Sequence, residues 1–161
     1  MKGFPKFLTI VGRVCISIIF ILSGINTIIH WHITETNLTL KLIDWHTFVI
    51  ERPWIADLFS FFLSWAVIFM VVAVFLELLG GILVFFGMKL RLGAFLLFLF
   101  LLLATVIYCP FWLVEGEKRK EEIVMFLQNI AILGGLLYVI ALGGEKPGKK
   151  PPPPSGPPKS E

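Results

Sequence analysis

Charge is scarce in this 161-residue sequence. Asp, Glu, Lys and Arg together make up 16% of it, whereas apolar residue types make up 57%. A soluble domain of this size needs far more polar residues to cover its surface, so the composition excludes an ordinary water-soluble protein. The net charge is only +3, and no segment gathers Lys and Arg on one polar face as nucleic-acid binders do. The sequence therefore indicates a membrane protein in contact with lipid and predicts no nucleic-acid partner.

Cysteine and histidine are also rare, with two and three copies. Cys15 and Cys109 cannot form a disulfide framework, and no Cys-x-x-Cys spacing is present. All three histidines fall in one connection, so a bis-histidine haem, which needs ligands on facing helices, lacks a second ligand. A metal site at His30 and His32 would lack further ligands too. We therefore predict no self-contained haem or metal site in this chain.

Four apolar runs are long enough to cross about 30 Å of hydrocarbon. They are residues 7–29, 59–86, 92–108 and 123–142. None alternates polar with apolar residues as barrel strands do, and backbone groups must be paired in lipid, so each run predicts a helix. The first run is too long for a signal peptide, and no small-residue cleavage site follows it. We expect an all-α integral membrane protein, a bundle of four transmembrane helices.

Basic residues in the connections predict the orientation of this bundle, because Lys and Arg collect on the cytoplasmic side of a membrane. Eight lie on the side of the two chain ends, and five lie on the opposite side among more acidic residues. The first set is Lys2, Lys6, Lys89, Arg91, Lys146, Lys149, Lys150 and Lys159, and the second is Lys41, Arg52, Lys118, Arg119 and Lys120. We therefore expect both termini in the cytoplasm.

The first connection, residues 30–58, is long enough to hold structure of its own. Four of its apolar residues have helical spacing, which predicts a helix lying on the outer membrane interface. These residues are Leu38, Leu42, Trp45 and Phe48. Pro53 is suited to the first turn of a helix, so the second spanning helix could begin early.

The end of the chain differs in composition from the rest. Residues 143–161 contain seven Pro, four Gly and four Lys, which predicts a disordered cytoplasmic tail after a membrane domain of residues 1–142. The simplest interpretation of the tail is a solvated basic end that helps to fix the topology. Attraction to lipid head groups, or a partner that binds Pro-x-x-Pro, is the alternative.

Only two formal charges lie inside the apolar runs, Arg13 and Glu77. Each costs about 3 kcal/mol at the membrane centre, so both need partners. Counted from the cytoplasmic ends, Arg13 lies about 9 Å deep and Glu77 about 14 Å deep, a difference that a guanidinium can span. We predict an intramembrane polar pair of Arg13 and Glu77. It would be either a clamp between helices or part of a proton, quinone or anion site.

A second group of polar residues is expected together in the outer half of the bundle. Its members are Ser23, Asn26, Thr105, Tyr108, Gln128 and Asn129. Amides at this level usually form hydrogen bonds between helices, which is the simpler interpretation. A binding pocket capped by Trp31, Trp112 and the first connection is the alternative. We call this group the outer polar cluster.

Several short segments of the sequence match the motifs of a known family in order and spacing. They are Gly12, Arg13, Phe20, Ser23, Gly24, Ile25 and Trp31; then Glu77, Leu78, Gly80, Gly81 and Gly87; then Ala104, Thr105, Phe111 and Trp112; and finally Asn129, Leu133, Gly134 and Gly135. On these residues the chain, from about 7 to 142, resembles the DoxX family of small four-helix bacterial membrane proteins. The resemblance implies a multi-pass protein of the bacterial cytoplasmic membrane, associated with membrane oxidoreductase systems. The family takes its name from a subunit of an archaeal terminal quinol oxidase, and some members partner thiol-redox enzymes.

The chain departs from the family pattern mainly in its outer half. Thr27, Cys109 and Gln128 stand where members often have Lys, His and Lys, whereas Arg13 and Glu77 stand where the inner Arg and Glu are expected. The resemblance implies an accessory or quinone-contacting subunit whose redox centres come from partner subunits. A non-enzymatic binder or carrier of small molecules or lipids is the alternative, and either could be a homo-oligomer. The residues do not predict catalysis by this chain alone.

Overall fold

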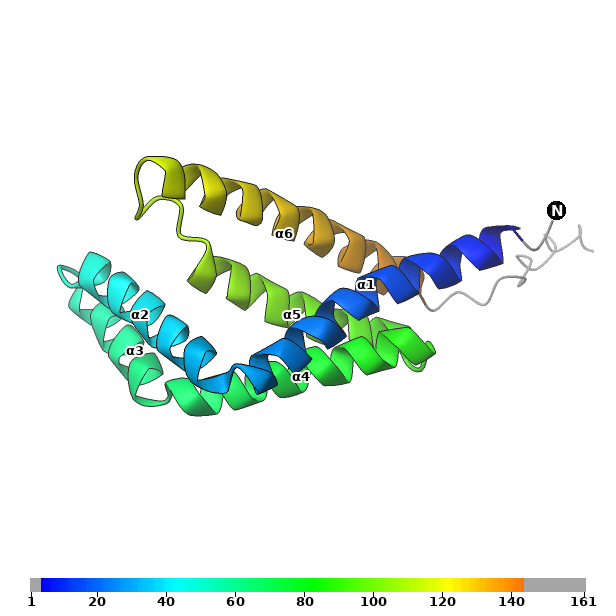
Figure 1. Cartoon of the computed structure of the whole chain (residues 1–161), viewed down its shortest axis with the longest axis horizontal. Helices are drawn as coiled ribbons and strands as arrows, with labels where there is room; N and C mark the ends of the chain where they lie inside the picture. Colours follow the sequence, from blue (N-terminus) through cyan, green and yellow to red (C-terminus); the bar gives the residue numbers. More distant parts are fainter. Residues whose placement is uncertain (1–3, 144–161) are drawn as a thin grey trace, which may run out of the picture.

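The computed structural model describes residues 4–143, and all the regular structure in that range is helical (Figure 1). The helices are α1 (Phe4–Ile29), α2 (Trp31–Val49), α3 (Pro53–Ser64), α4 (Ala66–Phe86), α5 (Leu90–Tyr108) and α6 (Glu117–Leu142). Four of them, α1, α4, α5 and α6, are long and apolar enough to cross a membrane. The prediction of an all-helical membrane protein with four spans is confirmed.

The four spans pack as neighbours in the order α1, α4, α5, α6. Their common core joins Phe20 of α1 to Val84, Leu97 and Leu136 of the other three spans. At most a third of the most apolar window of each span is buried in the protein, and only 11% of that of α6. Large apolar surfaces therefore remain on the outside of the bundle, where lipid can cover them.

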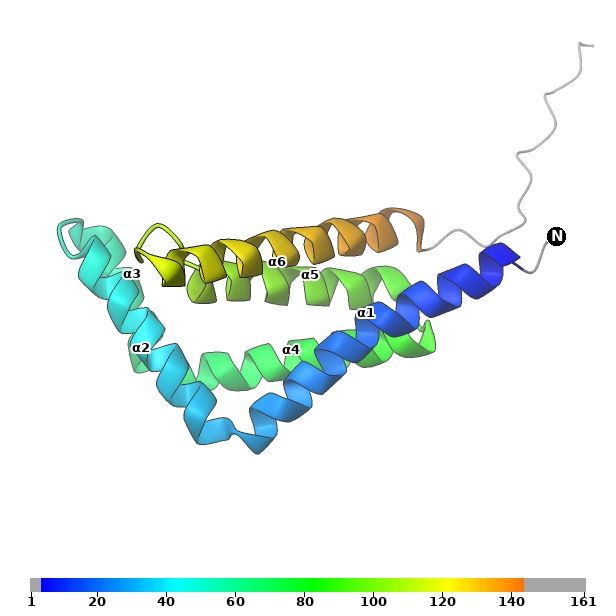
Figure 2. The ribbon, with the colours of Figure 1, turned by 45° about the horizontal axis from the view of Figure 1, so that its top comes forward.

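The two ends of the bundle are built differently (Figures 1 and 2). At one end lie the tight α4–α5 turn at residues 87–89, the start of α1 and the end of α6, and we call it the turn end. At the other end α2 and α3 form an antiparallel pair beside the α5–α6 connection, residues 109–116, and we call it the hairpin end. An even number of spans brings both described chain ends to the turn end. The side of the membrane on which that end lies stays a prediction.

The helix expected in the first connection is present as α2. Leu38 and Leu42 are buried as its spacing predicts, whereas Phe48 is 60% exposed. From the end of α1, the helix runs back over the ends of α4 and α5 toward the start of α6 (Figure 2). Its position at the membrane interface remains a prediction.

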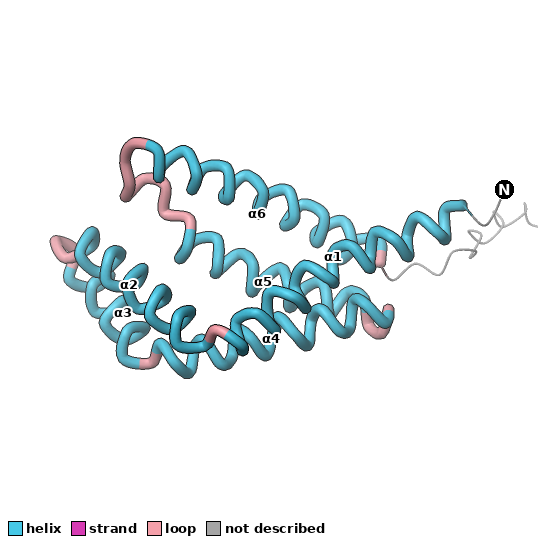
Figure 3. Tube along the Cα trace, viewed as in Figure 1, coloured by secondary structure: helices cyan, strands magenta, loops and turns pink. Residues whose placement is uncertain are grey.

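The second apolar run, residues 59–86, is not one helix. The chain breaks at Trp65, where α3 ends and α4 begins, and Figure 3 shows the break as a short loop. A straight helix of that length would measure about 42 Å, well beyond the hydrocarbon thickness of a membrane. Pro53 lies in the first turn of α3, a position that suits proline, but α3 is a separate helix, so the second span begins at Ala66 and not early at Pro53.

One further boundary differs from that expected, and another lies at the edge of the described residues. The last span starts at Glu117 rather than at residue 123, because the helix continues into the charged segment before the apolar run. The proposed tail falls almost entirely on residues 144–161, which lie outside the described residues. The division into residues 1–142 and 143–161 therefore stays a prediction.

Candidate functional site

Arg13, on α1, binds the C-terminal end of α4. Its Nε donates a hydrogen bond to the Val84 carbonyl and its Nη2 donates one to the Phe85 carbonyl, both at 3.3 Å. The last carbonyls of a helix have no partner inside it and carry partial negative charge, so a cation stabilises them. The guanidinium lies against Gly87, where φ is +72° and an added Cβ would collide with Arg13. The close contact therefore requires glycine at this turn.

Arg91, on α5, has the same role toward α6. Its Nη2 donates a hydrogen bond to the carbonyl of Ala141 at 3.3 Å. Two arginines at the turn end thus cap the C-terminal ends of two spanning helices. Both guanidinium groups therefore stabilise helix ends, and that of Arg13 is bonded to backbone carbonyls.

Glu77 lies in the middle of α4 and is only 1% exposed. It faces α1 at Gly24, where an added Cβ would lie 3.4 Å from Glu77 Oε2, and the Ser23 side chain lies close to the carboxyl group. Its Oε1 has no hydrogen-bond partner in the described part of the chain. Burying an ionised carboxylate without a cation costs far more than burying a neutral acid. The environment therefore suits a neutral carboxyl group, which can both donate and accept.

The expected Arg13–Glu77 ion pair is not formed among residues 4–143. Arg13 lies beside Val84 and Gly87, whereas Glu77 lies beside Gly24. The carbonyls that Arg13 binds lie seven and eight residues beyond Glu77 on α4, so the two contacts are about 11 Å apart along that helix. The sequence placed Arg13 and Glu77 at similar membrane depths by counting residues from the ends of the apolar runs. That estimate is wrong because α1 starts before residue 7 and projects past the α4–α5 turn (Figure 2). Arg13 therefore meets the end of α4 rather than its middle.

The outer polar cluster is only partly assembled in the structure. Asn129 Nδ2 donates a weak hydrogen bond to Cys109 Sγ at 3.8 Å, close to the end of α5 that carries Thr105 and Tyr108. Thr105 Oγ1 bonds the Leu101 carbonyl of its own helix at 2.6 Å. Tyr108 packs against the small apolar core under α2. These three residues therefore share one region of the hairpin end.

Asn26 and Gln128 do not join that region. Both side chains are exposed, and neither takes part in a hydrogen bond found among residues 4–143. The backbone carbonyl of Asn26, by contrast, accepts a hydrogen bond from the His30 N–H and contacts the His30 ring. The predicted cluster thus separates into a packed group near Cys109, two exposed amides, and Ser23 beside Glu77.

Sequence reasoning missed an ion pair that ties α2 to α6. Lys41 Nζ lies 2.7 Å from Glu122 Oε1, and the two side chains are only 25% and 11% exposed. Glu122 Oε2 is buried without a hydrogen-bond partner in this part of the structure. Lys41 lies next to Leu42 on the predicted apolar face of α2. A lysine on that face was the one feature of the sequence that indicated a buried ion pair. Its partner, 81 residues away, could not be inferred.

The Cys109 thiol lies near this ion pair, and aromatic rings gather around Trp45, one turn from Lys41 on α2. The Trp45 ring stacks on Phe59 of α3 at a centroid distance of 5.4 Å and meets Trp112 edge-on at 5.5 Å. Its Nε1 is buried and has no partner within the described ranges. Burial raises the pKa of the Cys109 thiol, and the nearby Glu122 carboxylate raises it further. The thiol is therefore poorly suited to act as a nucleophile.

Possible metal ligands do not cluster in the part of the chain that the structure describes. No group of three or more His, Cys, Asp or Glu side chains there could hold a metal ion. His30 and His32 lie where α1 passes into α2, and the His30 ring contacts the Asn26 carbonyl. Cys15 and Cys109 are both free thiols.

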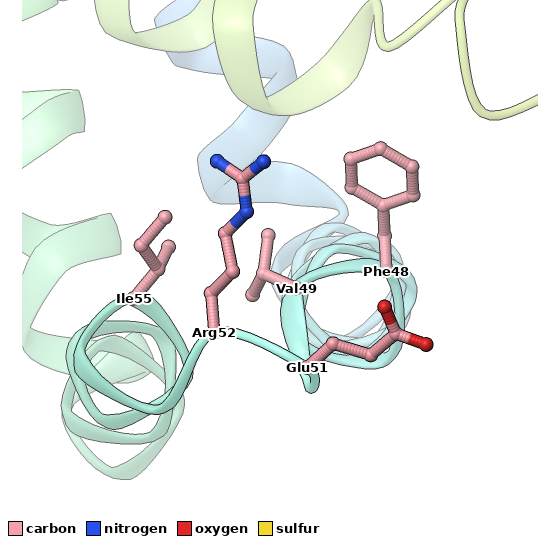
Figure 4. Close-up of a pocket in the computed structure, with 5 residues that line it drawn as sticks. All are labelled: Phe48, Val49, Glu51, Arg52 and Ile55. Carbon is pink, nitrogen blue, oxygen red and sulfur yellow. The ribbon is translucent and has the colours of Figure 1, made fainter.

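A cavity of about 390 Å³ opens at the α2–α3 turn (Figure 4). It is lined by Phe48, Val49, Glu51, Arg52 and Ile55. Figure 4 shows the Arg52 side chain extended between Val49 and Ile55, with Glu51 below the Phe48 ring. Neither charged side chain forms an ion pair within residues 4–143. The cavity thus presents one cation, one anion and an apolar wall.

A family model named DoxX matches residues 8–110, well over half of the chain. The chain belongs to the DoxX family. No solved structure matches it.

The DoxX match ends soon after α5. It includes Arg13, Glu77 and Gly87, which make up the two polar contacts between α1 and α4. It leaves out α6, and with it Glu122 and Gln128. The partners of α6 are therefore known from the structure alone.

Proposed function

We propose that this multi-pass membrane protein is an accessory subunit of an oxidoreductase system in a bacterial cell membrane. In this role it contacts a quinone or quinol at Glu77, while partner subunits supply the redox centres. The single observation that carries the proposal is the burial of Glu77 within a span, with Oε1 lacking a partner in the described residues.

The chemistry of Glu77 fits such a ligand. A neutral carboxyl group can donate to a quinone carbonyl or accept from a quinol hydroxyl, and both ligands are uncharged and soluble in lipid. Intramembrane ionisable residues commonly mark functional sites because they are costly to keep there. Arg13 has no part in this contact, since its guanidinium is bonded to the end of α4.

Two measurements test the proposal. The first is purification of the tagged full-length protein from its native membranes, where we expect recovery together with a flavin, haem or thiol oxidoreductase. The second is quinol-dependent electron transfer in those membranes, which Glu77→Leu should lower at least tenfold because it removes both the donor and the acceptor.

Glu77→Gln provides the matched control, because an amide also donates and accepts, and it should retain more activity than Glu77→Leu. Equal activity of the parent protein and Glu77→Leu, at equal amounts of folded protein, would rule out the contact. Recovery of the protein alone, with only lipid bound, would instead favour the second candidate.

That second candidate is a non-enzymatic binder or carrier of lipids or small molecules, and the cavity at the α2–α3 turn favours it. Arg52 and Glu51 beside an apolar wall match the phosphate, ammonium and acyl chains of a zwitterionic phospholipid. Native mass spectrometry of the protein with phosphatidylethanolamine tests it. Retained lipid should decrease in Arg52→Gln, and unchanged retention would count against this role.

A further inference from the structure

Two spanning helices that meet near the turn end move apart toward the hairpin end. α1 approaches α6 at Ile16, whose Cδ1 lies 4.0 Å from the Cβ position of Gly135. Beyond that point α1 follows α4 and turns away from α6, as both Figure 1 and Figure 2 show. The two helices therefore diverge along the half of the bundle nearer the hairpin end.

The helical register places Ser23 and Gln128 at the same level of this divergence. Ser23 lies seven residues from Ile16 toward the hairpin end, and Gln128 lies seven residues from Gly135 in the same direction. Seven residues make almost two whole turns, about 10.5 Å along a helix, and return to the same face. Ser23 and Gln128 therefore lie on the two faces that meet at Ile16 and Gly135.

Gln128 is the residue whose environment is hardest to explain by packing alone. It lies within the apolar part of α6, its side chain is exposed, and no hydrogen bond among residues 4–143 includes its amide. An unpaired amide facing lipid is costly, so a partner that both donates and accepts should stabilise it. Across the divergence, Ser23 is exposed as well and neighbours the Glu77 carboxyl group.

We propose that Ser23, Glu77 and Gln128 form one binding site, open sideways to lipid between α1 and α6. Its ligand is the uncharged, hydroxyl-bearing head of a lipid-soluble molecule. An uncharged head is expected because α4 and the apolar part of α6 carry no Lys or Arg, and Arg13 of α1 is bonded to the end of α4. The inference rests on the proposed function through Glu77, and it adds a residue of α6 and the direction of entry.

The test uses the full-length protein in lipid nanodiscs and two probes that share one ring and one tail. The first probe is decylhydroquinone, which has two hydroxyl groups, and the second is its dimethyl ether, which cannot donate. Binding is measured by native mass spectrometry or by a thermal shift. We expect the hydroquinone to bind at least tenfold more tightly, because the ether leaves the acceptors of the site unpaired.

Substitutions then locate the site. Gln128→Leu should weaken hydroquinone binding about fivefold or more, the loss expected for one hydrogen bond, and this change is well suited to a helix facing lipid. The matched control is Asn129→Leu, which removes an identical amide from the next position. Because the Asn129 amide is bonded to Cys109, the control should bind the probe as the parent protein does.

Failure of this inference can be told apart from failure of the proposed function. Unchanged binding in Gln128→Leu overturns the inference, even if the protein is recovered with an oxidoreductase. Loss of a dimer in Gln128→Leu without loss of probe binding also overturns it, because Gln128 would then contact a second copy. Selective binding of the hydroquinone by the isolated protein, lost in Gln128→Leu, supports the inference even if no oxidoreductase partner is recovered.

Discussion

The turn end and the hairpin end of this bundle use charge in opposite ways. At the turn end, Arg13 and Arg91 donate to helix carbonyls and remain partly exposed, so neither needs a carboxylate. At the hairpin end, Lys41 and Glu122 form a nearly buried ion pair. A cation beside a helix terminus is compensated by the backbone itself, whereas a buried carboxylate depends on one side chain. The turn end should therefore tolerate substitution better than the hairpin end.

The largest effect is expected from Lys41→Met. It leaves the Glu122 carboxylate buried with no cation, and removing one partner of such a pair costs about 3 kcal/mol in free energy of unfolding. The hairpin should also detach more readily from α6, since this is its only ion pair to that helix among the described residues. Unfolding in mixed detergent micelles and hydrogen exchange of α2 measure the two effects.

The control for that prediction is an exposed pair on the same span. Lys120 and Glu117 are also 2.7 Å apart, but their side chains are 73% and 84% exposed. Lys120→Met should therefore leave the stability nearly unchanged, because water compensates each charge. Equal losses in Lys41→Met and Lys120→Met would contradict the contrast between a buried and an exposed pair.

The second largest effect is expected at the turn end, from Gly87→Ala. The added Cβ meets Arg13 and the backbone φ of +72° disfavours alanine, so we expect a loss of about 2 kcal/mol in stability. Gly134→Ala is the matched control, because nothing lies within 4 Å of a Cβ there and alanine favours a helix. The control should be neutral or slightly stabilising, and a loss as large as that of Gly87→Ala would argue against the close contact.

These two contrasts show what could be predicted from the sequence. The spans followed from runs of apolar residues, and the buried face of α2 followed from the spacing of Leu38 and Leu42. The break at Trp65 could not be predicted, because no Gly or Pro marks it. Only the length of the apolar run indicated that a second helix was present. The partners of Arg13 and Lys41 depend on how helices cross, which local spacing does not encode.

A smaller effect is expected from Arg13→Met, which removes two long hydrogen bonds to the end of α4. We expect a loss of about 1 kcal/mol, because the carbonyls that it leaves lie near the helix end, where water can reach them. Combining Arg13→Met with Glu77→Gln tests whether the two residues interact. Since the two contacts are about 11 Å apart along α4, the losses of the single variants should add in the double variant.

A double-mutant cycle in detergent measures that additivity. Coupling well above about 0.5 kcal/mol would mean that Arg13 and Glu77 interact, as the sequence first suggested. Arg91→Met serves as the parallel case at the end of α6, and its loss should be of similar size. A much larger loss in Arg13→Met than in Arg91→Met would mean that Arg13 does more than cap a helix.

The smallest effect is expected from Asn129→Leu at the hairpin end. The only hydrogen bond of its side chain among the described residues is to the Cys109 sulfur at 3.8 Å, a weak acceptor, so the loss of stability should stay below about 0.5 kcal/mol. Leucine also suits a helix that faces lipid, which offsets part of that loss. The result separates the two interpretations of the outer polar cluster, because a simple contact between helices predicts small changes in both stability and activity. Complete loss of activity in a folded Asn129→Leu protein would instead place Asn129 in a binding pocket, and the site between α1 and α6 would then extend to the next residue.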